Sequence, residues 1–270
     1  MQSLDELIDR CEFLDAYTPN VDSLLPRGLA KTLYRTARWE NGPHQFDGAL
    51  TLRPEFLTEF CWSSSELEGC GLTLEETDSL LKLEEKRQIA AAERCEEARI
   101  VVNHKRALEL MVFETHPQRV TFNLLLLLQG RLMSGLLPPE QCGRVRDFAD
   151  PVSGAVRQPG DISALLEELL QLIAIKAAAI RNPVEAAFFL WIHVAYLQAF
   201  ADGNKRTGRL SANMPLLAGH CAPLSFGGVE ASDYVVVMLG VYERNDVSVA
   251  VDLFEWLYRR SMQKYPWLLS

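Results

Sequence analysis

One stretch of this sequence constrains the fold more than any other. Residues 186–200 read AAFFLWIHVAYLQAF and are apolar nearly all round, and Asn182 and Pro183 come just before them. Asparagine is a favoured helix N-cap and proline suits the first helical turn, so the sequence predicts a helix over residues 184–200. A helix without a polar face has to be buried on every side. Because no period-2 alternation recurs along the chain, we predict an all-α fold with this helix at its centre.

The composition is that of a globular protein and excludes several classes of function. The 270 residues are 48% hydrophobic and 23% charged, with a formal net charge of −9. An acidic chain has no general affinity for nucleic acid, and no charge-free apolar run reaches the roughly 18 residues that span a membrane. The N-terminal sequence MQSLDELIDR is acidic, unlike a signal peptide, and the six cysteines lack metal-binding spacing. We therefore expect a cytoplasmic protein with reduced cysteines and no nucleic-acid or membrane partner.

Other capped or amphipathic segments surround the central helix in three predicted regions. Residues 1–115 form an N-terminal helical region, 116–221 a core, and 222–270 C-terminal helices packed on that core. Thr73 and Glu76 predict a capping box for one helix, and Asp161 is the expected N-cap of another. The predicted helices lie at residues 3–14, 28–39, 54–67, 74–83, 120–134, 161–180, 210–217, 231–242 and 249–265.

The loop after the central helix concentrates the polar chemistry. Residues 198–209 read QAFADGNKRTGR, and a second apolar run follows them. The backbone N–H groups of a tight loop and the positive end of the next helix together make an anion site. Arg206 and Arg209 could bind phosphate oxygens as forks, with Lys205 as a point charge. Among these cations, Asp202 would suit a Mg²⁺ ion that arrives with a nucleotide.

This loop resembles the signature of the Fic family, His-x-Phe-x-(Asp/Glu)-Gly-Asn-(Gly/Lys)-Arg-x-x-Arg. Seven of its eight defined positions match, and the exception is the histidine, where this chain has Gln198. The resemblance implies a Fic-type helical bundle with a small β-hairpin flap, and transfer of AMP from ATP to a protein hydroxyl. Asp202 would hold Mg²⁺, although from the residues alone it could cap the next helix and Asn204 could be a left-handed turn residue. The residues implied to bind the ATP phosphates are Gly203, Asn204, Lys205, Arg206 and Arg209.

An upstream segment resembles a second motif, which belongs to a class of Fic proteins with an N-terminal inhibitory helix. That motif is (Ser/Thr)-x-x-x-Glu-(Gly/Asn), and it is matched by Ser64, Glu68 and Gly69. In that class the glutamate pairs with the last arginine of the signature, here Arg209, and occupies the place of the nucleotide γ-phosphate. A carboxylate that competes with phosphate for one guanidinium fork is physically an autoinhibitory switch.

A hairpin flap is expected at about residues 143–158. Turn signals at 151–154 could fold residues 145–156 into a hairpin, and the preceding residues 143–146 (GRVR) resemble the sequence before the flap in Fic relatives. In the family the flap pairs with an extended target segment by strand addition, so an unidentified target protein would bind there. A surface loop without a partner explains the same residues equally well.

Gln198 leaves the activity open. A glutamine amide can orient a hydroxyl but cannot carry its proton away, and losing a general base costs about 10²–10⁴-fold in rate. His193 precedes Gln198 by five residues, about 140° round a helix, so we expect a core residue and not a substitute base. The site could instead favour hydrolysis, with Glu68 activating water. The main alternative is a non-catalytic regulator that binds nucleotide or protein, and a homodimer is also left open.

Overall fold

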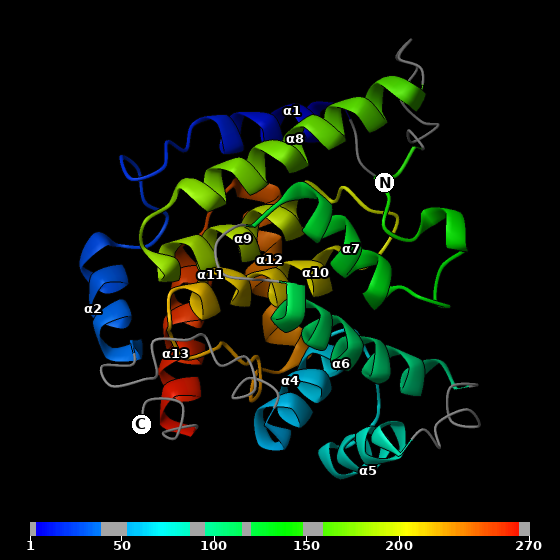
Figure 1. Ribbon diagram of the computed structural model, residues 1–270. Helices are drawn as coiled ribbons and strands as arrows, with labels where there is room; N and C mark the ends of the chain where they lie inside the picture. Colours follow the sequence, from blue (N-terminus) through cyan, green and yellow to red (C-terminus); the bar gives the residue numbers. More distant parts are fainter. Residues whose placement is uncertain (1–3, 39–52, 87–94, 115–119, 148–158, 265–270) are drawn as a thin grey trace.

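The structure is a computed structural model that describes residues 4–38, 53–86, 95–114, 120–147 and 159–264. These residues form helices joined by loops, and no β-strand occurs among them (Figure 1). The all-α prediction is therefore confirmed for this part of the chain. The helices are α1 (Leu4–Asp15), α2 (Arg27–Ala37), α4 (Pro54–Glu66), α5 (Leu74–Glu85), α6 (Glu96–Glu114), α7 (Phe122–Leu132), the 3₁₀ turn η2 (Pro139–Gln141), α8 (Pro159–Ala179), α9 (Pro183–Leu197), α10 (Asn204–Ser211), α11 (Asn213–Ala218), α12 (Ala231–Arg244) and α13 (Ser248–Lys264).

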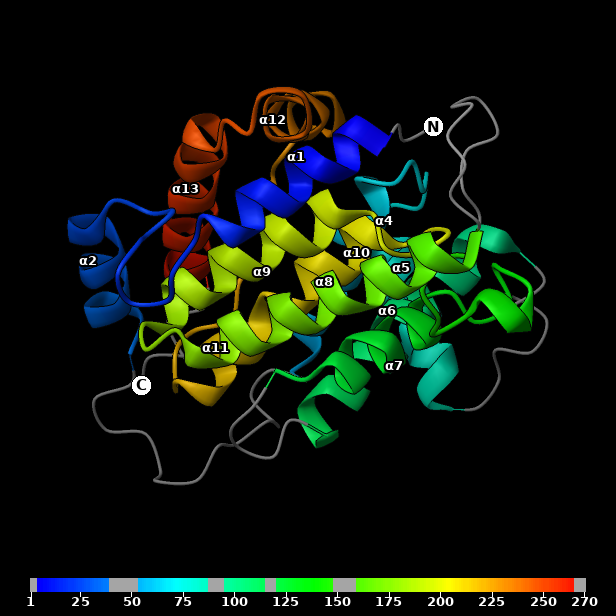
Figure 2. The same ribbon diagram turned by 90° about the horizontal axis from the view of Figure 1, so that it is seen from above.

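The helices are layered around α9. In Figure 1, α1 and α8 lie above α9, α10 and α11, and α4, α5 and α6 lie below them. Seen from above, α9 runs between α1 and α8, with α12 and α13 on the side opposite α7 (Figure 2). A hydrophobic cluster takes buried side chains from all three predicted regions. Within the described residues, none of the helices combines the length and apolar character needed to cross a membrane.

Helix α9 is buried along its whole length, as its lack of a polar face predicts. The predicted cap is also confirmed: the Asn182 side-chain oxygen accepts hydrogen bonds from the first backbone N–H groups of α9, and Pro183 occupies the first turn. Helix α10 packs tightly on this helix, because a Cβ at Gly208 would come within 2.9 Å of the Trp191 carbonyl oxygen. The polar loop between α9 and α10 is therefore held against a closely packed part of the core.

Several predicted boundaries are wrong, and three of them concern α8, α9 and the signature loop. Helix α9 ends at Leu197 and not at residue 200, because Gln198 takes a left-handed backbone with φ 53°. Residues 204–209 of the predicted signature loop are helical and begin α10, so only residues 198–203 form the loop. Helix α8 begins at Pro159, which puts the predicted N-cap Asp161 inside the helix. The capping box of Thr73 and Glu76 is present as predicted.

Glu185, in the first turn of α9, holds the N-terminal segment against the central helix. Its buried carboxylate accepts hydrogen bonds from the hydroxyls of Tyr17 (3.1 Å) and Ser23 (3.0 Å) and from the backbone N–H groups of Leu24 (2.7 Å) and Leu25 (3.1 Å). Burial, together with the Glu185 charge, raises the pKa of Tyr17, so the phenol stays protonated and donates. The carboxylate also suits the positive end of the helix. Sequence reasoning did not identify this contact.

We expect Glu185→Ala to lower the free energy of unfolding by about 3 kcal/mol, because several buried donors lose their acceptor. Urea denaturation measures the change. The matched control is Glu243→Ala, at an exposed position of α12, which should stay within about 0.5 kcal/mol of the parent. Equal stability of the two variants would show that the carboxylate does not hold the N-terminal segment.

Candidate functional site

The loop 198–203 connects α9 to α10 and ends at Gly203, a glycine with a left-handed backbone conformation. Gly203 has φ +82°, and a Cβ there would meet Met133 Sδ at 2.8 Å, so a larger residue would be strained and crowded. The first backbone hydrogen bond of α10 runs from the Thr207 N–H to the Gly203 carbonyl. The N–H groups of residues 204–206 have no acceptor within the helix, and Gly203 provides no side-chain cap. This helix end is suited to an anion.

Two of the expected ligands take part in the loop itself. Asn204 accepts from the Phe200 N–H (2.9 Å) and donates to the Phe200 carbonyl (2.9 Å), which braces the turn. It is the first residue of a helix and not a left-handed turn residue. The Asp202 carboxylate accepts from the Gly203 N–H (2.5 Å) and pairs with Arg206 (2.9 Å), yet its side chain remains 57% exposed. Asp202 is therefore accessible to a cation, whereas Asn204 supports the loop.

Three cations extend from the first two turns of α10. Arg209 is fully buried, Arg206 is 6% exposed, and the Lys205 side chain is 32% exposed. In the part of the chain that the structure describes, Arg206 Nε is a buried donor with no hydrogen-bond acceptor. Buried donors are normally paired, so this nitrogen together with the start of α10 fits a phosphate oxygen.

Metal binding at this loop would have to depend on a bound nucleotide. No group of three or more His, Cys, Asp or Glu side chains that could hold a metal occurs among the described residues. A single accessible carboxylate beside a phosphate site is nevertheless what magnesium uses, because it is usually bound by one or two carboxylates together with phosphates and water. Asp202 fits that role.

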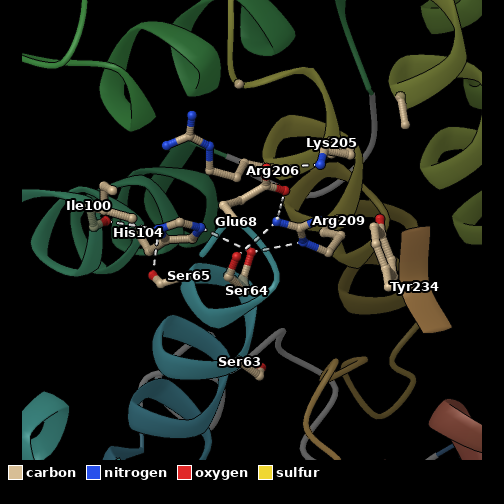
Figure 3. Close-up of polar contacts among 12 residues, drawn as sticks. Ser63, Ser64, Ser65, Glu68, Ile100, His104, Lys205, Arg206, Arg209 and Tyr234 are labelled. Atoms are coloured by element: carbon tan, nitrogen blue, oxygen red, sulfur yellow. Dashed lines mark hydrogen bonds and ion pairs between the residues drawn. The ribbon is translucent and has the colours of Figure 1, made fainter. Parts of the chain in front are cut away.

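A carboxylate from a different part of the chain closes the cluster. Glu68 follows α4, and its oxygens lie 2.7 Å from Arg209 Nη2 and 3.1 Å from Lys205 Nζ (Figure 3). Burial alone would raise the pKa of Glu68, but the charges of Arg209 and Lys205 outweigh it and lower the pKa overall. The carboxylate is therefore ionised near neutral pH and forms ion pairs with Arg209 and Lys205.

Ser64 and Gly69 complete this contact between α4 and α10. Arg209 donates from Nε to the Ser64 hydroxyl (3.0 Å) and from Nη2 to the Ser64 carbonyl (2.8 Å). Gly69 takes φ +89° in the turn directly after Glu68. One guanidinium therefore binds a carboxylate, a hydroxyl and a carbonyl of the segment that the inhibitory motif singled out. Its Cζ also lies 5.2 Å from the centroid of the Tyr234 ring.

Gln198 has its amide engaged by protein groups. Its Nε2 donates to the Ala195 carbonyl (2.5 Å) and to the Tyr242 hydroxyl (3.5 Å), and its Oε1 accepts from Asn204 Nδ2 (3.4 Å). The Gln198 backbone carbonyl accepts from Arg146 Nε (2.9 Å). Burial raises the pKa of Tyr242, so its hydroxyl is neutral. Neither Gln198 nor Tyr242 is a base near neutral pH.

His193 and Phe200 are core residues, as predicted. His193 is 2% exposed, and its ring centroid lies 4.7 Å from that of Phe13 and 4.3 Å from that of Phe189. Burial lowers the pKa of His193 to about 3. Enclosed in this aromatic cluster, His193 does not take the place of the missing base. Phe200 is 2% exposed and anchors the loop in the core.

Sequence reasoning missed the residue that holds the loop from the side of α7. Gln129 is fully buried, donates to the Asp202 carbonyl (3.0 Å) and accepts from the Gly143 N–H (2.6 Å). The Arg146 N–H donates to a loop carbonyl at 2.9 Å. The segment that leads into the expected flap is thus fixed against the loop, whereas the flap hairpin itself, residues 148–158, lies outside the described residues. The sequence signal for this role was a single polar residue, Gln129, directly after five leucines in the run LLLLLQG.

Comparison with known proteins identifies the central part of the chain. Residues 119–216 match the model of the Fic/DOC family. These residues form a Fic domain. The fold resembles that of Fic-1 from C. elegans, with a TM-score of 0.62 and 18% identity over 98% of this chain and 71% of that chain. It also resembles a Fic domain containing signaling protein from Bacteroides thetaiotaomicron (TM-score 0.60, 20% identity, 87% and 94% covered) and a Fic family protein from Desulfovibrio desulfuricans (TM-score 0.60, 18% identity, 98% and 75% covered).

The Fic domain contains the loop, its cations and Gln129, but not the carboxylate that closes the cluster. Ser64 and Glu68 belong to the region before residue 119, outside the matched residues. The contact with Arg209 therefore joins the Fic domain to an element that precedes it in the chain.

Proposed function

We propose that this protein binds ATP with Mg²⁺ at residues 198–209 and that Glu68 restrains this binding. The observation that carries the proposal is the Glu68 carboxylate bound by Arg209 and Lys205. Carboxylates and phosphates use the same guanidinium donors, so the inhibitory carboxylate and a phosphate oxygen compete for them. The free energy of the Glu68 contact is then subtracted from that of nucleotide binding.

The residues of the loop have separate parts in this proposal. The N–H groups of residues 204–206 and Arg206 Nε would bind phosphate oxygens, as would Lys205 and Arg209 once Glu68 leaves them. Asp202 would hold the magnesium ion. Asn204 acts indirectly by keeping the loop in shape through Phe200. Bound ATP would supply the AMP group that is transferred: the target hydroxyl oxygen bonds to the α-phosphorus, the bond between the α- and β-phosphates breaks, and pyrophosphate leaves.

The proposed reaction is AMP transfer to the hydroxyl of an unidentified target protein, at a rate lowered by Gln198. To orient that hydroxyl, the Gln198 amide would have to leave its contacts with Ala195 and Asn204, and it could not take up the proton. The target would bind at the flap. Among the described residues, a cavity of about 520 Å³ is lined by residues 143–147 and by parts of α7 and α8, and it gives room for a target side chain.

The same contacts of Gln198 favour a second candidate function. If the amide stays bound to Ala195 and Asn204, the site binds nucleotide without turning it over. The protein would then be a regulator whose Fic domain reports nucleotide binding to a partner.

We expect Glu68→Gly to tighten Mg·ATP binding by about 10–100-fold, because it frees a charge-assisted pair that competes with phosphate. Isothermal titration calorimetry of Mg·ATP measures the dissociation constants of the parent and the variant. The matched control is Glu66→Gly, two residues earlier, which should leave the dissociation constant within about threefold. Absence of Mg·ATP binding by all three proteins would refute the nucleotide site.

A further inference from the structure

A series of buried hydrogen bonds links Arg209 of α10 to Ser64 of α4 and Ser64 to His104 of α6. The Ser64 oxygen that accepts from Arg209 lies 3.0 Å from His104 Nε2, and His104 Nδ1 lies 2.8 Å from the Ile100 carbonyl oxygen (Figure 3). Ser64 and Arg209 are fully buried and His104 is 1% exposed. Three helices therefore meet at one buried hydroxyl, which has to satisfy a donor from α10 and a ring nitrogen from α6.

We propose that His104 is a positioning residue for the inhibitory contact. It accepts a hydrogen bond from the Ser64 hydroxyl, which leaves the Ser64 oxygen free to accept from Arg209 and keeps α4 docked on α10. This inference rests on the proposed restraint by Glu68 and adds a residue of α6 that maintains it.

The direction of each proton follows from what the groups can do. The Ile100 carbonyl can only accept, so His104 Nδ1 carries the hydrogen. In a neutral ring Nε2 is then an acceptor, and the Ser64 hydroxyl donates to it. Arg209 Nε can only donate, so it needs a lone pair on the Ser64 oxygen. That lone pair is available because the Ser64 proton is directed at the histidine.

The neighbouring serine fits the same assignment. The Ser65 hydroxyl donates to the Cys61 carbonyl at 2.6 Å, one helical turn earlier in α4. Its oxygen, 3.3 Å from His104 Nδ1, can then only accept from that ring nitrogen. Both ring nitrogens therefore have consistent partners when the hydrogen is on Nδ1.

The surroundings keep the ring neutral, as this assignment requires. Burial lowers the pKa of His104 to about 3, with help from the charges of Arg206 and Arg209 and against the opposing effects of the Ile100 hydrogen bond and Glu68. A charged ring would offer donors from both nitrogens. The Ser64 oxygen would then face two donors and its own proton would lose its acceptor.

Removing the acceptor at position 104 therefore weakens the contact of α4 with α10. The buried Ser64 proton would compete with the Arg209 N–H for the same space, and a buried donor without an acceptor is costly. Helix α4 relaxes away from α10, Glu68 loses part of its attachment, and the site becomes more accessible to a nucleotide. A residue with only a general structural role would weaken binding or leave it unchanged, whereas the loss of His104 is expected to tighten it.

Two substitutions test this with Mg·ATP calorimetry on the whole chain. His104→Phe keeps a flat ring but has no acceptor, and we expect the dissociation constant to fall by about tenfold, toward that of Glu68→Gly. His104→Gln keeps an acceptor at a similar distance and should stay within about threefold of the parent. Amide hydrogen exchange at residues 64–69 should become faster in His104→Phe and stay slow in His104→Gln, while exchange in α9 stays slow in both.

The outcomes separate this inference from the proposed function. If Glu68→Gly tightens binding and His104→Phe does not, the inference is wrong and the restraint by Glu68 stands. If neither substitution changes Mg·ATP binding, the proposed restraint itself is wrong. Because His104 acts only through the Ser64 hydroxyl, Ser64→Ala should reproduce His104→Phe, and Ser64→Thr, which retains a hydroxyl, should resemble the parent. If His104→Phe does not fold, His104→Leu, which also lacks an acceptor, gives the same decision, and additive effects in a Ser64→Ala, His104→Phe double variant would contradict the proposal.

Discussion

Gln198→His in a Glu68→Gly background is expected to raise the rate of AMP transfer to protein by about 10²–10⁴-fold. The imidazole supplies the general base that the amide lacks, and this is the usual contribution of such a base. Position 198 has φ 53°, and histidine is among the residues that tolerate the left-handed region. Glu68→Gly is included so that nucleotide binding does not limit the rate. The measurement is transfer of label to protein from ATP labelled at the α-phosphorus.

Gln198→Asn is the matched control for this substitution. Asparagine keeps an amide, provides no base and is also tolerated in the left-handed region. We therefore expect Gln198→Asn in the Glu68→Gly background to transfer AMP at the same rate as Glu68→Gly alone. If Glu68→Gly alone transfers AMP as fast as the Glu68→Gly, Gln198→His protein, the missing base is not important for the rate. Mg·ATP binding without label in any of these proteins would favour the non-catalytic regulator.

We expect the protein to lose stability steeply between pH 6 and pH 5, because it buries two neutral histidines. The pKa values of His104 and His193 are lowered by burial to about 3, from an ordinary value of 6.5. The unfolded chain therefore binds more protons than the folded one throughout this interval. Their stabilising contribution is complete above 6.5 and is lost as the pH falls toward 3, at about 1.4 kcal/mol per pH unit for each histidine.

His193→Phe tests the pH dependence directly. Its ring packs between Phe13 and Phe189, so phenylalanine suits the site, and the loss of free energy of unfolding between pH 6 and pH 5 should fall by about 1.4 kcal/mol. Urea unfolding at the two pH values measures it. Phe189→Leu is the control, since it alters packing without removing a titrating group and should lower stability equally at both. An unchanged loss in His193→Phe would show that this histidine does not titrate on unfolding.

The pH interval is chosen to isolate the histidines from the carboxylates. Glu68 also has a lowered pKa, so its contribution has the same sign and disappears as the pH falls through its folded value. That loss begins only near its ordinary pKa of 4.5, below the interval used. Acid sensitivity above pH 5 therefore reports chiefly on the buried rings.

Much of the candidate site could be predicted because its residues are close together in sequence. Asp202, Gly203 and the three cations fall within residues 202–209, so the sequence alone predicts that they form one cluster. The structure places the cations on the first two turns of α10 and not in the predicted loop. Ser64 and Glu68 were singled out by their spacing, and the structure brings both to Arg209. The role of Asn204 was less predictable, because an amide side chain serves equally well as a ligand and as a brace for the backbone.

Local patterns of apolarity, capping and turn residues determined the helical class of this protein, its central helix α9 and the turn that follows it. A period of 3.6 residues and the conformational freedom of glycine depend only on neighbouring residues. Only the tertiary structure decided which buried polar side chains from distant elements bond to one another. Glu185 with Tyr17, Gln129 with Gly143, and His104 with Ser64 are contacts between elements distant in the chain. Their partners follow from how the helices pack around α9, since a buried polar group bonds to whatever donor or acceptor the packing places beside it.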